Sequence, residues 1–63
     1  MYTVTYYINR QPFTYGIKFN SEWAAKIMAF RMFHECNLAT DVMREGTGEI
    51  VAIFEPGNIQ WNC

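Results

Sequence analysis

The sequence predicts a small α+β protein in which two β-hairpins flank one helix, in the order ββαββ. Two runs of alternating apolar and polar residues precede a helical segment that lacks Gly and Pro, and two further strand-like runs follow it. This pattern predicts a four-stranded antiparallel sheet with one helix packed on one face. The 63 residues form a single domain, residues 1–63. A chain of this length buries only about 60% of its unfolded surface, so its core is thin.

The first hairpin is predicted from residues 2–8 and 13–19. Residues 2–8 place β-branched and aromatic side chains at alternate positions, which is the signal of a strand. A turn sequence that contains Pro12 separates this run from residues 13–19, which alternate again. The apolar residues expected on one side of the second strand are Phe13, Tyr15, Ile17 and Phe19.

A helix is predicted over residues 21–36. Asn20 or Ser21 can cap its first turn by accepting a hydrogen bond from a free backbone amide. The segment is rich in Ala and Met. Asn37 can end the helix because asparagine tolerates the left-handed conformation.

The second hairpin is predicted from strands at residues 38–44 and 49–54. The intervening segment 45–48 contains two glycines and is interpreted as a tight turn. It is a poor candidate for a phosphate-binding loop, since it has no lysine and leads into a strand rather than a helix. Residues 55–63 are expected to form a tail.

The predicted helix has two apolar stripes, although a single sheet face covers only one. The first stripe consists of small and flexible side chains: Ala25, Met28, Ala29, Met32 and Cys36. The second is mainly aromatic: Trp23, Ile27, Phe30 and His34, with Phe33 at its flank. The aromatic stripe could instead form the core, or the tail could cover whichever stripe is left. Because small alanines allow close packing on a sheet, we expect the aromatic stripe to face outward.

An outward aromatic stripe predicts a protein-binding surface, because exposed patches of this kind mark interfaces. The residues expected at the interface are Trp23, Ile27, Phe30 and His34. The partner is either a different protein or a second copy in a homodimer. We therefore expect a non-enzymatic protein–protein interaction module.

Binding of single-stranded nucleic acid is the alternative function. The aromatic residues that could stack bases on a sheet are Tyr2, Tyr6, Tyr7 and Tyr15. However, the net charge is −1 and the five basic residues are scattered singly along the chain. Nucleic-acid-binding domains usually gather several basic residues on one face, so this partner is disfavoured.

No residue pattern indicates a catalytic, cofactor or metal site. His34 and Cys36 are about 200° apart around a helix, so they cannot share a metal ion or act as a nucleophilic pair. Cys36 is expected to be a buried, inert thiol in the Ala/Met stripe, and Cys63 to react readily. With no targeting or membrane-spanning segment expected, the predicted location is the cytoplasm and no membrane partner is expected.

A set of structural motifs extends over most of the chain. They are Phe19-Asn20-Ser21 followed by Ala24-Ala25 and Ala29, then Thr40-x-Val42 and Gly48-x-Ile50-Val51. This pattern resembles the short accessory proteins of bacteriophages and other mobile elements. The resemblance implies an inhibitor or adaptor that binds a host protein in the host cytoplasm, as anti-CRISPR proteins do. It implies no catalytic residue.

Overall fold

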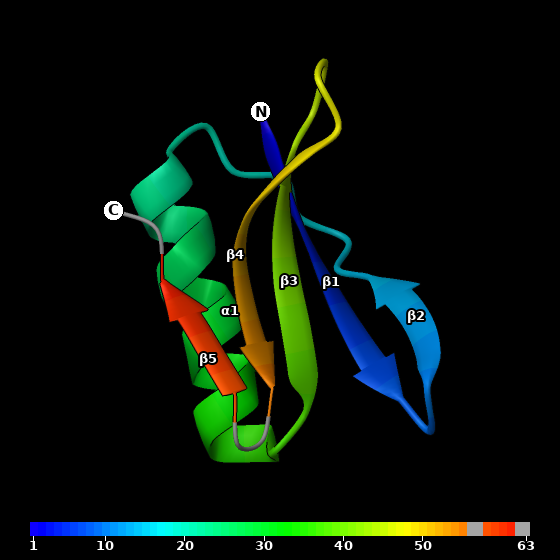
Figure 1. Ribbon diagram of the computed structural model, residues 1–63. Coiled ribbons are helices and arrows are strands. Elements are labelled where there is room, and N and C mark those ends of the chain that lie inside the picture. The colour runs from blue at the N-terminus through cyan, green and yellow to red at the C-terminus, as the bar shows by residue number, and fades with distance from the viewer. Residues whose placement is uncertain (56–57, 62–63) are drawn as a thin grey trace.

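The computed structural model describes residues 1–55 and 58–61, the last four as backbone only. It confirms the α+β class and the predicted order of two strands, a helix and two strands, and adds a fifth strand (Figure 1). All neighbouring strands are antiparallel, in the order β2-β1-β3-β4-β5. The elements are β1 (Tyr2–Ile8), β2 (Gln11–Thr14), α1 (Glu22–Cys36), β3 (Ala39–Arg44), β4 (Glu49–Glu55) and β5 (Asn58–Trp61).

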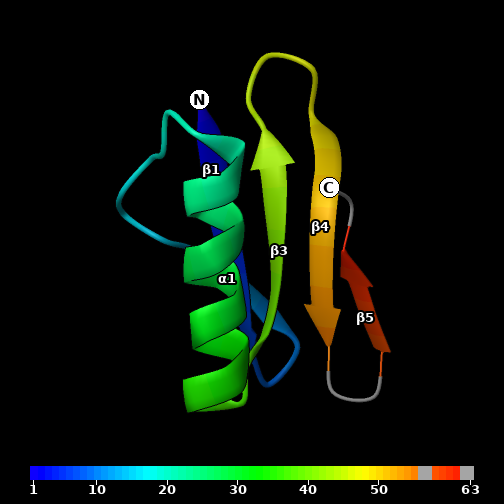
Figure 2. The same ribbon diagram turned by 90° about the vertical axis from the view of Figure 1, so that its left-hand side faces the viewer.

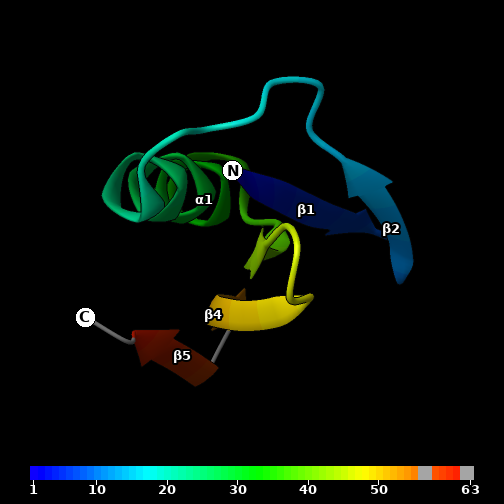
Figure 3. The ribbon, with the colours of Figure 1, turned by 90° about the horizontal axis from the view of Figure 1, so that it is seen from above.

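The helix covers one face of the sheet and leaves the other uncovered. It contacts β1, β3 and β4, and it runs alongside these strands in Figure 2. Seen from above, α1 lies on one side of the sheet, and the edge strands β2 and β5 lie at its two ends (Figure 3). We call the side that carries α1 the helix-side face and the other side the open face.

A tight two-residue turn joins β1 to β2. Asn9 and Arg10 both have positive φ, 51° and 68°, and Ile8 pairs with Gln11 directly across the turn. Two consecutive positive φ values define the turn type whose twist matches that of a β-hairpin. Pro12 follows on β2, where an edge strand tolerates its missing N–H.

The strand predicted at residues 13–19 is shorter than expected and begins earlier. Regular pairing ends at Thr14, although Tyr15 N–H still donates to the Val4 carbonyl at 2.8 Å. The chain then leaves the sheet and returns at Phe19, which pairs with Tyr2 through hydrogen bonds of 2.7 and 2.9 Å. The excursion explains why Ile17 is 58% exposed instead of lying beside Phe19.

The helix ends at the predicted residue, Cys36, and begins at Glu22, one residue later than predicted. Ser21, rather than Asn20, is the N-cap, and its hydroxyl accepts a 3.4 Å hydrogen bond from Ala24 N–H. Asn37 ends the helix in the left-handed conformation, with φ 56° and ψ 38°. Ser21 thus supplies an acceptor for a backbone amide that has no partner within the helix. Asn37 adopts the left-handed backbone conformation that commonly ends a helix.

The second hairpin contains the predicted glycine turn and an irregularity that the sequence did not reveal. Gly46 and Gly48 have φ of 96° and 74°, values that favour glycine. Val42 pairs with Ala52 and Met43 with Ile50, so Val51 is an extra residue in β4. This β-bulge allows two consecutive residues, Val51 and Ala52, to be buried, and thereby accounts for part of the continuous apolar run.

The expected tail, residues 55–63, also differs from the structure. Glu55 still belongs to β4, and residues 58–61 form β5, which pairs with β4. In the second hairpin, β3 begins at Ala39 instead of residue 38, and β4 ends at Glu55 instead of residue 54. The possibility that tail side chains cover a helix stripe lies outside the described residues.

The core lies between α1 and the three central strands. Its fully buried side chains are Val4, Val42 and Phe54 from the strands and Ala25 and Ala29 from the helix. Thr40, also buried, donates its hydroxyl to the Ala29 carbonyl at 3.0 Å. The two alanines and this hydrogen bond bring helix and sheet close together.

Replacing Thr40 by valine is expected to lower the free energy of unfolding by about 1 kcal/mol. Valine keeps the shape of the side chain and removes the hydroxyl that bonds Ala29. Chemical denaturation measures the change. Thr14→Val, on exposed β2, is the matched control and should alter stability by less than about 0.5 kcal/mol. Equal effects of the two substitutions would contradict the structural role of Thr40.

Candidate functional site

The outer side of α1 carries the predicted aromatic stripe. Trp23, Ile27 and Phe30 are 56%, 41% and 37% exposed, and His34 is exposed as well. Ala25 and Ala29 on the opposite side are completely buried against the sheet. Ala25 and Ala29 thus face inward and the four residues expected at the surface are exposed, as predicted, whereas Phe33 at their flank packs against the core. We refer to Trp23, Ile27, Phe30 and His34 together as the outer stripe.

Phe30 connects the outer stripe to the core. Its ring packs edge-on against the fully buried Phe54, with ring centres 5.6 Å apart. Phe33 and His34 lie 6.2 and 5.9 Å from it on the same helix. Contacts of this geometry fix the orientation of the Phe30 and His34 rings, so this part of the outer stripe is an ordered aromatic surface.

Cys36 does not lie in the core, contrary to the prediction. Helical periodicity places it in line with Ala25 and Ala29, but it is the last residue of α1 and its side chain is exposed. Periodicity gives the direction of a side chain without showing where the covering sheet ends. The predicted reactivity of Cys63 lies outside the described residues.

Lys26 is buried, although lysine side chains are usually exposed. Only 1% of its side chain is exposed, and its ammonium group lies 2.8 Å from a Glu22 oxygen. The other Glu22 oxygen accepts from Arg44 at 3.3 Å, and Arg44 also lies 3.5 Å from Glu49. The hydrogen bond from Lys26 is the main reason why the pKa of Glu22 is lowered. This charged cluster joins the first turns of α1 to the β3–β4 hairpin.

The four tyrosines do not form one stacking platform. Tyr2 and Tyr15 pack against the core, and Tyr6 stacks on Phe13 with ring centres 5.7 Å apart. Tyr7, on the open face, donates its hydroxyl to the Asp41 carboxylate at 2.7 Å. A carboxylate beside that ring repels phosphate, so the arrangement gives no support to base stacking along the sheet.

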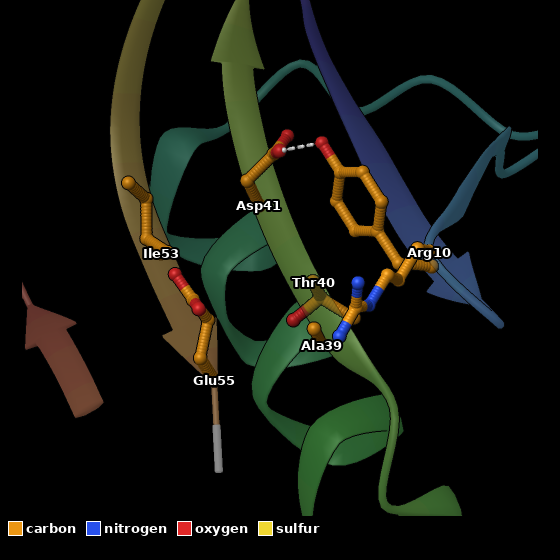
Figure 4. A pocket seen from close by; sticks show the side chains of 7 residues that line it. Arg10, Ala39, Thr40, Asp41, Ile53 and Glu55 are labelled. Carbon is orange, nitrogen blue, oxygen red and sulfur yellow. Dashed lines mark hydrogen bonds between the residues drawn. The ribbon is translucent and has the colours of Figure 1, made fainter. Parts of the chain in front are cut away.

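The open face contains a pocket that the sequence analysis did not identify. Its volume is about 420 Å³, and it lies across β1, β3 and β4 (Figure 4). The lining residues are Tyr7, Arg10, Ala39, Thr40, Asp41, Ile53 and Glu55. Alternation does place Tyr7 and Asp41 on one side of their strands, but their proximity depends on the β1–β3 pairing.

Asp41 is a partly dehydrated acid of this pocket. Its carboxylate is partly buried, and loss of hydration raises its pKa, opposed by the hydrogen bond from Tyr7. The pKa of Tyr7 is raised in turn, first by that hydrogen bond and then by burial. Tyr7 therefore remains a proton donor, and Asp41 is a carboxylate with reduced hydration.

The described residues contain neither a group of metal ligands nor a membrane-spanning helix. No group of three His, Cys, Asp or Glu side chains able to hold a metal ion occurs among residues whose placement is described. Within the same part of the chain, no helix has the length and apolar content needed to cross a membrane. Comparisons with known proteins gave no match to a family model, a curated protein or a solved structure.

The exposed position of Cys36 predicts rapid modification. In a Cys63→Ser variant, which leaves Cys36 as the only thiol, a disulfide reagent should label the native protein nearly as fast as the denatured protein. Absorbance of the released chromophore measures the rate. Labelling that requires unfolding would show that Cys36 is covered.

Asp41→Asn is expected to change how stability depends on pH. The raised pKa of Asp41 means that folding favours its protonated form, so the wild-type protein loses stability as pH rises through the interval between the ordinary aspartate pKa and the raised pKa. Asparagine still accepts from Tyr7 but does not titrate. Thermal unfolding at a series of pH values should show the variant more stable above this interval, with the difference shrinking below it. The opposite trend would mean that the charged carboxylate stabilises the fold.

Proposed function

We propose that the protein is a non-enzymatic protein-binding module that uses the outer stripe of α1. The observation that carries the proposal is the exposure of Trp23, Ile27 and Phe30 side by side on one helix. Tryptophan and large apolar residues are typical anchors of interfaces. The aromatic contacts of Phe30 hold part of this surface in a fixed arrangement before binding, which reduces the entropy lost on association.

A second copy of the chain is the first partner that we propose. The four residues of the outer stripe are separated by four, three and four positions, a spacing that reads the same in both directions. Two antiparallel helices related by a two-fold axis would therefore place Trp23 opposite His34 and Ile27 opposite Phe30. Two-fold interfaces require such self-complementary surfaces.

The energy of such a dimer is modest. Complete burial of a large apolar side chain contributes about 1.5–3 kcal/mol, and those of the outer stripe are already partly covered. Association costs roughly 4–15 kcal/mol. The gain from two copies of the stripe is therefore comparable with the cost of association, so the dimer is expected to be weak and to form only as protein concentration rises.

A narrower form of the proposal follows from the resemblance to phage accessory proteins. In this form the outer stripe binds a host protein in the host cytoplasm, and the homodimer uses the same surface. The stripe would serve both partners, so substitutions that prevent dimerisation would also weaken binding to the host protein.

Ile27→Glu tests the proposal directly. Ile27 is exposed at the centre of the stripe, and glutamate favours a helix, so the domain should remain folded while a carboxylate enters the apolar interface. We expect the wild-type mass to rise above the 7.4 kDa of one chain at high micromolar concentration, and the variant to stay at one chain. Light scattering over a concentration series measures both.

Ile50→Glu is the matched control, because Ile50 is similarly exposed but lies on β4. It should self-associate like the wild type. Circular dichroism verifies that each variant is folded. A wild-type mass of one chain throughout the series would overturn the homodimer, and equal effects of the two variants would overturn the assignment of the outer stripe.

A further inference from the structure

The pocket on the open face has the size and composition of a small ligand site. Its volume of about 420 Å³ falls within the range of roughly 300–1,000 Å³ that is typical of such sites. Ala39, Ile53 and the ring of Tyr7 supply apolar wall, and Asp41, Glu55 and Arg10 supply charge (Figure 4). The pocket lies on the opposite side of the sheet from α1, so it is separate from the outer stripe.

The three charged residues of the pocket are not paired with one another. Among the described side chains, neither Arg10 nor Glu55 forms an ion pair, and the five ion pairs found there all involve other residues. Asp41 receives the Tyr7 hydroxyl on one oxygen, Oδ2. A carboxylate offers about four acceptor sites, so most of its capacity is available to a ligand.

The position of Asp41 makes it the central polar group. It lies on β3 directly opposite Ile53 of β4, and Glu55 follows two residues later on the same face of β4. Two carboxylates thus border an apolar wall from neighbouring strands. Tyr7 holds the Asp41 carboxylate in place from β1 at 2.7 Å.

We propose that this pocket binds the ammonium group of an organic cation with a short apolar stem. Asp41 and Glu55 accept hydrogen bonds from the ammonium, and Ile53, Ala39 and the face of the Tyr7 ring contact the stem. The cation is a free alkylamine or the side chain of a lysine, which present the same chemistry. Hydrogen bonds between an ammonium and a carboxylate are stronger than those between neutral groups, which favours such a ligand in a site of reduced hydration.

The role of Arg10 differs between a cation and an anion in this pocket. It belongs to the β1–β2 turn and is the only cation among the described lining residues, against two acids. If the pocket bound a carboxylate or phosphate, Arg10 would be its main contact. In a cation site Arg10 is a competitor, so its removal strengthens binding. The sign of this effect separates the two kinds of ligand.

A nuclear magnetic resonance titration of the full chain with n-butylammonium chloride tests the proposal. We expect saturable shifts of the Ala39 and Ile53 methyl signals, and none with sodium butyrate of the same chain length at equal ionic strength. Asp41→Asn should weaken binding by at least about tenfold, the loss expected for one hydrogen bond to a charged group. Arg10→Gln should strengthen it.

Glu35→Gln is the matched control, since it removes the same charge from the exposed outer side of α1 and should leave binding unchanged. If Asp41→Asn fails to fold, Glu55→Gln takes its place in the comparison. A titration with a blocked Gly-Lys-Gly peptide distinguishes the sources: tighter binding than n-butylammonium identifies a lysine side chain, and weaker binding identifies a free amine. Absence of saturation, preference for butyrate, or equal weakening by Glu35→Gln would overturn the proposal.

Discussion

The close contact between α1 and β3 is the constraint on which the rest of the structure depends. Ala25 and Ala29 present almost no side chain to the sheet, and the Thr40 hydroxyl reaches the Ala29 carbonyl at 3.0 Å. A larger residue at either alanine position would separate the two layers and break this hydrogen bond. Where α1 lies closest to β3, the helix therefore carries small residues, whereas Met32 and Phe33 pack against the core beside this contact. The close contact directs Ala25 and Ala29 to the sheet and thereby leaves Trp23 and Ile27 on the outer side of the helix.

The single helix leaves the second face of the sheet uncovered. One 15-residue helix covers parts of β1, β3 and β4, and the described chain contains no second layer for the open face. A bare sheet face in a protein of this size is usually lined by polar side chains, and here Thr5 and Asp41 provide them. What distinguishes this face is the mixture of a partly dehydrated carboxylate with Ile53 and Ala39. Apolar wall beside unpaired charge is typical of a ligand site.

Much of the fold could be predicted because local signals agreed with one another. Alternation in residues 2–8, the Ser21 cap, the Asn37 stop and the glycine turn each specify one element without reference to the others. The outer stripe was predictable for the same reason, since a helix has a fixed period. These features depend on residues that are neighbours in sequence.

The remaining features depend on residues distant in sequence. Phe19 returns to the sheet because Tyr2 is available there, and β5 forms because β4 offers a free edge. The pocket likewise requires Tyr7, Asp41 and Glu55 to meet from three strands. Neither alternation nor composition shows which strands become neighbours. Cys36 was misplaced for a related reason, because the sequence shows the direction of its side chain but not the limit of the sheet.

Lys26 and Ile27 show how the rotation of the helix is determined. They are adjacent in sequence, yet the lysine is buried and the isoleucine is 41% exposed, the reverse of what hydrophobicity alone would favour. Rotating α1 by about one residue, 100°, so that Ile27 takes the place of Lys26 would move Lys26 to the place of Ala25, against the sheet. That rotation would also move Ala29 away from Thr40 and separate Glu22 from Arg44. An ammonium group buried without its carboxylate is strongly unfavourable, so Lys26 depends on Glu22 remaining between it and Arg44. The charged cluster and the Thr40 hydrogen bond therefore select the same rotation, and together they keep Ile27 on the surface.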